Sequence, residues 1–418
     1  MKAILEQAVV QLPKGRQNVL WAVAGTGVLA FVVGLATGSA ERVWEALLLN
    51  TVFWGGIAQV GIMLSVIWQV TDAKWGRAFK RVAEGLGAFL PVTFVMFILI
   101  FFGAGHLYEW VHHPHAPKAG YFALPFFISR NLTGLLLMYG ISFFFLMASI
   151  KPDLALARKL IPGWGGKFAD WVLKGYGDHD QEVIRLEALS RKLAPLLGVV
   201  YAVVISMVAF DFVMSLDQTW FSTLFGVFFF VSSIYTTLAL MLVIMWRLRQ
   251  LPGVDEYVTI NRMHDLAKLT FAFAMLWNYM VFSQYLIIWY SNLPEETPYL
   301  VSRSWEATPW KPIFWTLWFV LFLFPFLGLM SRTVCRRPPL TALVGAILFV
   351  GQYFSFYLLV VPSIQDRHPN PSFLMGYQEI LVTAGFGAGF FLCFFAFMSR
   401  VPILPISDKH LTKTWHGR

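Results

Sequence analysis

The chain has 418 residues, of which 58% are hydrophobic and only 13% are charged, and its formal net charge is +9. A soluble domain of this length could not bury so much apolar surface, so the composition excludes an ordinary water-soluble protein. The positive charge alone would be compatible with nucleic-acid binding, but its distribution along the chain excludes that function.

Ten apolar stretches recur along the chain, and each is long enough to cross a lipid bilayer as a helix. A β-barrel is excluded because the stretches are too long and do not alternate between apolar and polar positions. The sequence therefore predicts an all-α integral membrane protein whose residues 1–418 form a single polytopic domain. The ten expected helices are residues 17–37, 43–70, 88–107, 125–149, 193–214, 219–246, 266–291, 310–331, 339–361 and 376–399.

The basic residues are distributed unevenly between the segments that connect these helices. When the segments are assigned alternately to the two sides of the membrane, 25 of the 32 Lys and Arg residues fall on one side and five on the other. Cytoplasmic segments of membrane proteins carry such an excess. We therefore expect both termini in the cytoplasm and no nucleic-acid partner. We also expect the first apolar segment to be retained as a helix and not cleaved as a signal peptide.

The longest connecting segment, residues 151–192, is charged and partly periodic. We expect it to be a cytoplasmic loop that carries a surface helix.

Residues that bind redox cofactors are scarce. The two cysteines, Cys335 and Cys393, are far apart and match no motif for an iron–sulfur cluster or a c-type haem. None of the nine histidines lies near the centre of a predicted helix, which excludes the axial ligands of a diheme cytochrome b. A Walker motif is also absent, which makes ATP-driven transport a poor interpretation. No cofactor or metal is therefore expected in this chain.

Two carboxylates interrupt the apolar run SMVAFDFVMSLDQTWFST (206–223). The predicted topology places Asp211 and Asp217 where helix five reaches the outer side and helix six begins. Asp217 is expected to cap helix six by accepting its free N–H groups. Asp211 lies about one turn inside helix five, where a protonatable carboxyl could take up a proton or bind a polar ligand. Arg130, which opens helix four, could pair with Asp211 or Glu109, or anchor to lipid headgroups.

The outer segment HLYEWVHHPH (106–115) contains four histidines and one glutamate. His106 and Glu109 are one turn apart, but the spacing of the segment matches no defined zinc site. A solvated loop that contacts a partner protein, with His106 or Glu109 as a proton relay, is favoured over a metal site.

Helix seven is unusually polar for a membrane helix. Asn278 and Tyr285 share one of its faces, and Lys268 and Tyr279 share another. Asp265 could pair with Lys268 at the cytoplasmic end, where Lys268 would either take up protons or extend its charged end to the membrane surface. Asn278 could be part of a proton relay or could form an interhelical hydrogen bond.

Three motifs resemble the membrane subunits of alternative complex III, the bacterial quinol:cytochrome c (or high-potential acceptor) oxidoreductase. The motifs are FDFVMSLDQTWFST (210–223), WNYMVFSQYLIIWYSNLPEET (277–297) and the ISRN start of helix four. The resemblance runs across essentially all ten helices. In length, the chain is most similar to the smaller, ActF-type subunit of the two polysulfide-reductase-type (NrfD-like) subunits.

The resemblance implies a fold of two four-helix bundles, helices 2–5 and 6–9, flanked by helices one and ten. It places the chain in the bacterial cytoplasmic (inner) membrane. It also implies partners: lipid, the larger NrfD-like subunit, an iron–sulfur subunit, multihaem and monohaem cytochrome c subunits, and in some cases a terminal oxidase. The iron–sulfur clusters and c-type haems would therefore lie in partner subunits.

In this family, quinol oxidation is placed at the larger NrfD-like subunit, and the smaller subunit is proposed to contribute a proton path and scaffolding. The residues that fit such a path here lie on the outer side, on the inner side or between the two. The outer set is Asp211, Asp217, His106, Glu109 and Arg130. The inner set is Lys268, Asp265 and Asp72, and the set between them is Tyr139, Asn278, Tyr279 and Tyr285.

Three alternatives remain open. The chain itself could bind quinol at the outer ends of helices 3–6, near Asp211, His106 and Arg130, because an aromatic-lined slot with a proton acceptor is what a quinol needs. It could also be a purely structural subunit. A secondary transporter fits less well, because the long uninterrupted runs give no sign of the broken helices that such proteins carry near the midplane.

Overall fold

The computed structural model describes residues 5, 10–113, 119–305, 308–367, 375–409 and 411, and this part of the chain is helical with no strand. Seven of the long spans are continuous α-helices: α2 (Lys14–Ala36), α3 (Ala40–Val70), α7 (Leu124–Leu160), α10 (Phe225–Leu248), α11 (Ile260–Ser291), α16 (Pro338–Gln365) and α17 (Tyr377–Met398).

The other three long spans contain local irregularities. Their segments, in chain order, are η1 (Lys74–Phe79), α4 (Lys80–Leu86), η2 (Gly87–Phe89) and α5 (Leu90–Phe102); α9 (His179–Val208), η5 (Ala209–Val213) and η6 (Met214–Leu216); and α13 (Trp310–Trp318), η7 (Phe319–Leu323) and α14 (Phe324–Leu329). Short helices in the connections are α6 (Ala104–Leu107), η3 (Glu109–Val111), α8 (Gly166–Val172), α12 (Thr297–Ser304) and α15 (Arg332–Cys335).

The predicted all-α membrane architecture is confirmed: the described residues form ten helices that are long and apolar enough to cross a membrane. Several boundaries were wrong. The third span begins at Lys74 and not at residue 88, α7 continues to Leu160, α9 begins at His179, and α10 begins only at Phe225. The apolar runs underestimate the third span, α7 and α9 because charged residues extend helices beyond the hydrocarbon region, where water or a paired charge stabilises them. For α10 the run begins too early, because the apolar residues before Phe225 lie in a turn that Asp217 fixes.

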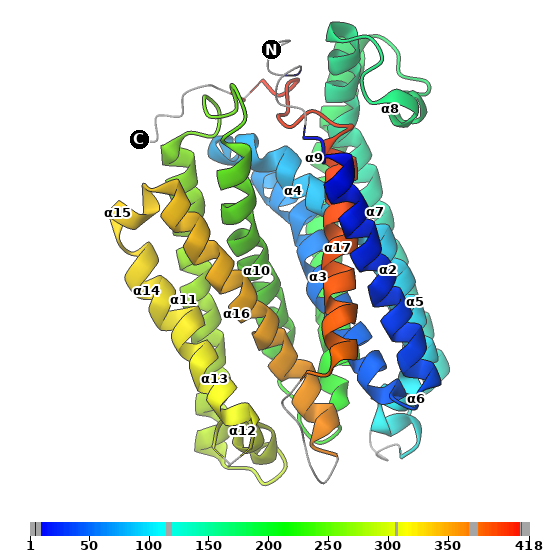
Figure 1. Ribbon diagram of the computed structural model, residues 1–418, viewed down its shortest axis with the longest axis vertical. Coiled ribbons are helices and arrows are strands. Elements are labelled where there is room, and N and C mark those ends of the chain that lie inside the picture. The colour runs from blue at the N-terminus through cyan, green and yellow to red at the C-terminus, as the bar shows by residue number, and fades with distance from the viewer. Residues whose placement is uncertain are drawn as a thin grey trace.

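These longer helices shorten the expected loop. Between the end of α7 and the start of α9, only residues 161–178 lie outside the two long helices, and α8 occupies seven of them. The segment 151–192 is therefore mostly an extension of two membrane helices, with the short helix α8 beside them (Figure 1).

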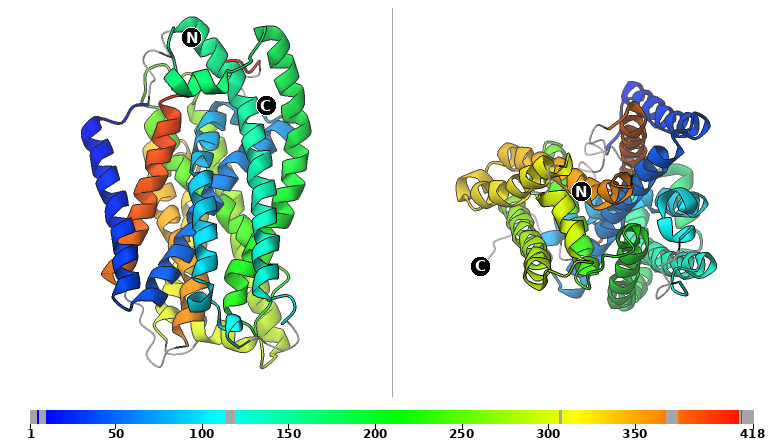
Figure 2. Two further views of the ribbon diagram at one scale, coloured as in Figure 1. Left: turned by 90° about the vertical axis from the view of Figure 1, so that its right-hand side faces the viewer. Right: turned by 90° about the horizontal axis from the view of Figure 1, so that it is seen from below.

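The helices form two groups that lie side by side in Figure 1. One group consists of α3, α4–α5, α7 and α9, and the other of α10, α11, α13–α14 and α16, so the contacts follow the grouping of helices 2–5 and 6–9. The first and last spans, α2 and α17, pack against each other and against α3, and Figure 2 shows them together at one edge of the molecule.

Two glycines set the distance between α2 and α17. A Cβ atom on Gly27 would lie 2.7 Å from the Cα atom of Gly385, and a Cβ atom on Gly385 would lie 2.8 Å from the Cα atom of Gly27. No side chain fits at either position, so the two backbones are in direct contact, as in the small-residue interfaces of membrane helices.

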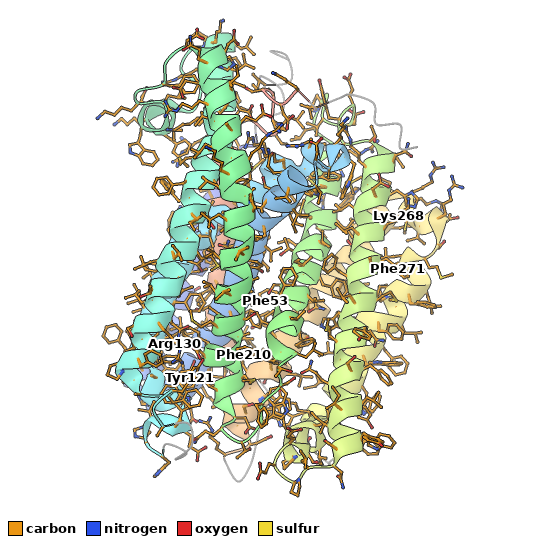
Figure 3. All side chains as sticks on the ribbon, turned by 180° about the vertical axis from the view of Figure 1, so that it is seen from behind. Phe53, Tyr121, Arg130, Phe210, Lys268 and Phe271 are labelled. Carbon is orange, nitrogen blue, oxygen red and sulfur yellow. The ribbon has the colours of Figure 1, made fainter. Side chains whose placement is uncertain are left out.

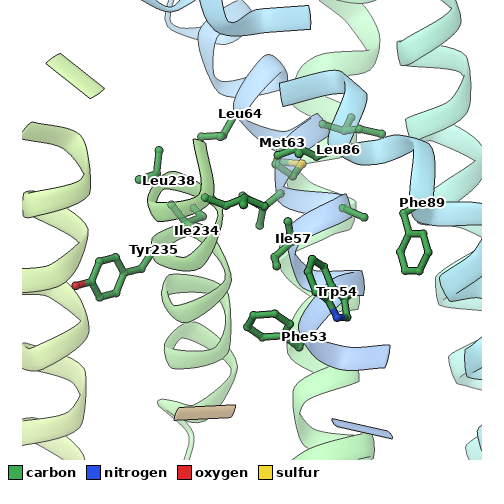
Figure 4. Close-up of a cluster of buried hydrophobic side chains, with 14 of the residues drawn as sticks. Phe53, Trp54, Ile57, Met63, Leu64, Leu86, Phe89, Ile234, Tyr235 and Leu238 are labelled. Atoms are coloured by element: carbon green, nitrogen blue, oxygen red, sulfur yellow. The ribbon is translucent and has the colours of Figure 1, made fainter. Parts of the chain in front are cut away.

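Helix α3 is the centre of the molecule. Every residue from Val43 to Val66 is buried, and α3 contacts α4, α5, α9, α10, α16 and α17. Figure 4 shows Phe53, Ile57 and Leu64 of α3 between Ile234 and Leu238 of α10 on one side and Leu86 and Phe89 on the other. The core thus joins the two bundles through one helix that has no surface for lipid.

The two ends of the bundle differ in charge. The start of α2 and the end of α17 lie at the same end, at the top of Figure 1, together with α8, α15 and most of the described Lys and Arg residues. We call this the basic end. We call the other end of the bundle, which carries α6, η3 and α12, the opposite end.

Candidate functional site

At the opposite end, Asp211 is completely buried in a π-helical turn, η5, within the fifth span. Its carboxylate accepts four hydrogen bonds from three side chains. Oδ2 accepts from Arg130 Nε at 2.7 Å and Asn131 Nδ2 at 2.6 Å, and Oδ1 accepts from Arg130 Nη2 at 2.8 Å and Tyr121 OH at 2.9 Å. Of the three possibilities considered for Arg130, the pairing with Asp211 is the one that the structure has, and it is bidentate.

The guanidinium of Arg130 is held in place by Tyr121. Its Nη1 donates to the carbonyl oxygen of Tyr121 at 2.8 Å, and its central carbon lies 3.7 Å from the centre of the Tyr121 ring. Figure 3 shows Arg130 and Tyr121 together at this end of the bundle. Each oxygen of Asp211 already accepts two hydrogen bonds, so the carboxylate has no further lone-pair site for another donor.

Two tyrosines near Asp211 remain neutral hydrogen-bond donors. Burial, with the negative charge of Asp211 as a second cause, raises the pKa of Tyr121 to about 12. The same two causes raise the pKa of Tyr108 well above its ordinary value, and Tyr108 OH donates to the carbonyl oxygen of Phe212 at 3.1 Å. The π-helical turn is thus anchored both through a side chain and through its backbone.

A second group of buried charges lies at the basic end, around Arg81. The Arg81 side chain donates from Nε to Asp153 Oδ2 at 2.7 Å and from Nη1 to Ser149 Oγ at 2.9 Å, and it also pairs with Glu84. Glu84 Oε1 accepts from Ser65 Oγ and from Ser149 Oγ, each at 2.7 Å. All five of these residues are buried. We call Arg81, Glu84 and Asp153 the basic-end charge cluster.

A cavity of about 100 Å³ leads to this cluster from the basic end. Lys80, whose Nζ atom lies 4.0 Å from Glu84, lines the cavity together with Arg81 and Asp153. The C-terminal segment closes one side, because the backbone N–H of Ser407 donates to Asp153 Oδ1 at 2.7 Å. The cluster is therefore buried but adjoins a polar cavity at the membrane surface.

Buried polar side chains recur along one face of α7 between the two charge groups. Asn131, Ser142, Ser149 and Asp153 are all buried on this face. Ser142 Oγ accepts from Gln59 Nε2 of α3 at 3.0 Å. At a rise of ~1.5 Å per residue, Asn131 and Ser142 are separated by ~16 Å along the helix, and Ser142 and Ser149 by ~10 Å. Tyr139 OH lies in the wider gap, 3.1 Å from Thr93 Oγ1.

Three of the outer residues named from the sequence lie apart from Asp211. Asp217 does not cap α10, which begins at Phe225; instead its Oδ1 accepts from the backbone N–H groups of Thr219 and Trp220 at 3.0 and 3.2 Å and fixes the turn before the helix. His106 and Glu109 are exposed. Glu109 and Asp217 line a polar cavity of about 740 Å³ at the opposite end, which we call the vestibule.

The residues named in helix seven lie in the second bundle. Lys268 Nζ is 3.4 Å from Asp265, as predicted, but the side chain of Lys268 is 60% exposed, and Figure 3 shows it at the other end of the molecule from Arg130. Tyr279 is exposed, and Asn278 accepts a hydrogen bond from Trp318 Nε1 at 3.0 Å, which is the structural role considered for it. Tyr285 lines an apolar cavity of about 100 Å³ between α10, α11, α12, α13 and α16, which we call the aromatic slot and which Trp277 also lines.

Asp72 lies on the surface of the basic end. The residue has a positive φ of 50°, its side chain is 61% exposed, and its carboxylate pairs with Arg77 at 3.3 Å.

Sequence reasoning missed the basic-end charge cluster. Arg81 and Glu84 fell in a presumed loop before residue 88, and Asp153 in the presumed loop after residue 149. The signal was present in KRVAEGL (80–86), where basic and acidic residues recur at helical spacing next to an apolar run. Glu45, buried in α3 and hydrogen-bonded to Gln365 Nε2 at 3.0 Å, was missed in the same way.

Within the described ranges, no three His, Cys, Asp or Glu side chains are placed to hold a metal ion. Pro114 and His115 of the histidine-rich segment lie outside the described residues.

The fold and the two charge groups define a multi-pass α-helical membrane protein with buried ion pairs near both ends of its first bundle. Comparison with models of known protein families finds no match for the chain, and comparison with curated proteins finds none either.

Proposed function

We propose that the chain is a membrane subunit of a quinol-oxidising respiratory complex of the alternative complex III type, and that it supplies scaffolding and a path for protons. The observation that carries this proposal is the basic-end charge cluster, in which Arg81 pairs with Glu84 and Asp153, all three buried, beside a cavity. Ionisable residues are costly inside a membrane and commonly mark proton or ion pathways.

The basic end would be the cytoplasmic side of a bacterial inner membrane, in agreement with the excess of Lys and Arg. Asp153 lines the cavity at this end, and Arg81 links it to Glu84, so these two carboxylates would be where protons enter the path. They replace Lys268 and Asp265 in this role, since the latter pair lies on the outside of the other bundle. Gln59, Ser142 and Tyr139 would carry the path between the two ends with the help of water.

In this proposal the chain holds no cofactor of its own. Electrons would pass through partner subunits: the larger NrfD-like membrane subunit, an iron–sulfur subunit, and multihaem and monohaem cytochrome c subunits, with a terminal oxidase as a further associate. Lipid surrounds the exposed apolar side chains of α2, α9 and α11, which are abundant.

The structural alternative is favoured for one of the two groups. Asp211 is saturated with hydrogen bonds and locks α7 to the fifth span, which is the geometry of a structural ion pair. The saturated carboxylate also weakens the alternative that a quinol binds beside it, because neither Asp211 nor Arg130 lines the basic-end cavity, the vestibule or the aromatic slot.

Two experiments test the proposal: co-purification of partner subunits and measurement of the protons released per electron. Purification of the tagged chain from its native membrane should bring down a multihaem cytochrome and an iron–sulfur protein. In the assembled complex, Glu84→Gln should reduce the number of protons released per electron, whereas Glu182→Gln, at an ion pair with Arg185 on the surface of α9, should not. Unchanged proton stoichiometry in an assembled Glu84→Gln complex would remove the proton path and leave the scaffolding role.

A further inference from the structure

A groove of about 520 Å³ lies in the first bundle between α7 and α17, and we call it the α7–α17 groove. Leu136 and Phe143 of α7 and Cys393 and Phe397 of α17 belong to its lining, together with residues of η2 and α5 and two aromatic residues of α8. In the left view of Figure 2, α17, α5 and α7 lie beside one another in this order. Arg400 is the one charged side chain among the described residues that line the groove.

The groove opens on the surface that faces lipid. Its lining residues Leu136, Phe143 and Trp171 are exposed, and the first two lie within the membrane-spanning part of α7. The lining also includes Gly140, where a Cβ atom would meet nothing within 4 Å, so open space lies directly in front of the α7 backbone. Water is not stable against such an apolar wall, because it finds no hydrogen-bond partners there. A hydrocarbon chain is the occupant that the wall favours.

The length of the groove matches one leaflet of a bilayer. Its lining on α7 extends from Leu136 to Met147, which is ~16 Å at a rise of ~1.5 Å per residue. The hydrocarbon core of a bilayer is ~30 Å thick, so this distance is about half of it. The buried polar residues Ser149 and Asp153 follow on α7 toward the basic end. The groove therefore lies in the half of the membrane on the basic side.

Arg400 lies where a lipid headgroup would be. It follows the end of α17 at Met398, at the basic end, and its side chain is exposed. Its carbonyl oxygen accepts from Trp164 Nε1 at 3.1 Å, and its guanidinium carbon lies 5.9 Å from the centre of the Phe168 ring, which also lines the groove. None of the ion pairs between described residues includes Arg400. A positive charge without a protein counter-charge thus stands at the basic end of an apolar groove.

We propose that the α7–α17 groove binds one anionic phospholipid of the leaflet at the basic end, with an acyl chain along α7 and the phosphate at Arg400. A guanidinium matches the oxygens of a phosphate with two parallel N–H groups. A lipid with a net negative charge is preferred over phosphatidylcholine, because the choline cation next to the phosphate is repelled by Arg400. The bound lipid would fill the space between α7 and α17 and join α8 to the end of α17.

Native mass spectrometry of the full-length chain in detergent can test the headgroup. When phosphatidylglycerol and phosphatidylcholine with identical acyl chains are added together, the wild type should bind one phosphatidylglycerol about tenfold more tightly, the effect of one hydrogen bond between charged groups. Arg400→Gln should remove this preference. The matched control is Arg247→Gln, because Arg247 is also exposed at the basic end beside an aromatic ring but lies outside the groove. This control should keep the preference.

A second pair of variants tests the acyl chain. Gly140→Leu places a side chain in the open part of the groove and should abolish this site for both lipids. Gly198→Leu on α9 is the matched control, since a Cβ atom there also meets nothing within 4 Å and Gly198 does not line the groove. A phosphatidylglycerol with a diazirine in its acyl chain should label peptides that contain residues 136–147 or 393–400 in the wild type and in Gly198→Leu, but not in Gly140→Leu.

Three results would overturn the inference. The first is equal binding of the two lipids by the wild type, and the second is a preference for phosphatidylglycerol that survives in Arg400→Gln. The third is labelling of the groove that persists in Gly140→Leu. The assays need no partner subunit, so their outcome does not depend on the proposed function.

Discussion

Arg130 and Asp211 form a two-point ion pair across the first bundle, with Nε–Oδ2 and Nη2–Oδ1 distances of 2.7 and 2.8 Å, although the two residues are 81 positions apart in sequence. The pair joins α7 to the π-helical turn η5. The carboxylate is fully enclosed, while the arginine retains only 12% exposure of its side chain.

Asp211→Asn should therefore destabilise the protein strongly, because it leaves the guanidinium of Arg130 buried without its counter-charge. The expected loss is about 3–5 kcal/mol, the range for breaking one partner of a buried pair. Thermal unfolding in detergent should show a lower melting temperature.

The double variant Arg130→Met/Asp211→Leu separates charge from packing. It removes both charges and should recover much of the lost stability. A double variant as unstable as Asp211→Asn would show that the ion pair is not the cause.

The basic-end charge cluster predicts a similar loss of stability in Arg81→Met. Without the guanidinium, the carboxylates of Glu84 and Asp153 remain buried, with Lys80 as the nearest described cation, 4.0 Å from Glu84. The expected cost is again about 3–5 kcal/mol, measured as a shift in thermal unfolding. Arg185→Met provides the control: this arginine pairs with Glu182 but is 73% exposed, so its loss should cost about 0–1 kcal/mol. Equal effects of the two substitutions would contradict a specific role for burial.

The contact between α2 and α17 predicts that even one methyl group is too large at Gly27. In Gly27→Ala, the new Cβ atom would meet the Cα atom of Gly385 at 2.7 Å and the carbonyl oxygen of Leu381 at 3.0 Å, so the helices must separate. Overpacking of this kind costs about 1–3 kcal/mol.

Susceptibility of the loop between α2 and α3 to limited proteolysis should rise in Gly27→Ala. Gly25→Ala is the matched control, since a Cβ atom there meets nothing within 4 Å. If both variants behave alike, close packing at Gly27 is not what holds α2.

The raised pKa of Tyr121 predicts that the protein loses stability at alkaline pH. Its pKa is raised by burial and by Asp211 to about 12, whereas an unfolded tyrosine titrates near 10. The neutral form is favoured in the folded state, so this contribution to stability is complete below about pH 10 and is lost as the pH rises toward 12.

In Tyr121→Phe, the melting temperature should consequently fall less steeply between pH 10 and pH 12 than in the wild type. Tyr290→Phe, at a side chain that is 85% exposed, should keep the wild-type slope. A wild-type slope in Tyr121→Phe would mean that the tyrosine ionises in the same way in both states.

The ten helices could be predicted because a membrane imposes a length and an apolar composition that a single sequence displays directly. The pairing of Arg130 with Asp211 could be anticipated for the same reason, since two opposite charges inside apolar segments on one side of the membrane have few other partners. The helix ends could not be placed well, because helices continue past the hydrocarbon region wherever their charges are paired or solvated.

The basic-end charge cluster could not be predicted from the composition of its segments. Arg81, Glu84 and Asp153 looked like ordinary charges of cytoplasmic loops, and only the packing of α4 against α3 and the hydrogen bonds of Arg81 to α7 show that they are buried. The slot around Trp277 was equally hidden, because aromatic residues at helix ends are common in every membrane protein. Composition cannot distinguish an indole that faces lipid from one that faces a cavity.

Helix α3 has a consequence for how the protein is made. It leaves the ribosome second, yet the helices that cover it include α10, α16 and α17, which are synthesised much later. Until then Glu45 and Asn50 must face lipid, water or the insertion machinery, because their native partners Gln365 and Thr383 do not yet exist. Assembly of the two bundles is therefore necessarily late, and a nascent chain that stalls before α16 would leave these two polar side chains of α3 without their partners.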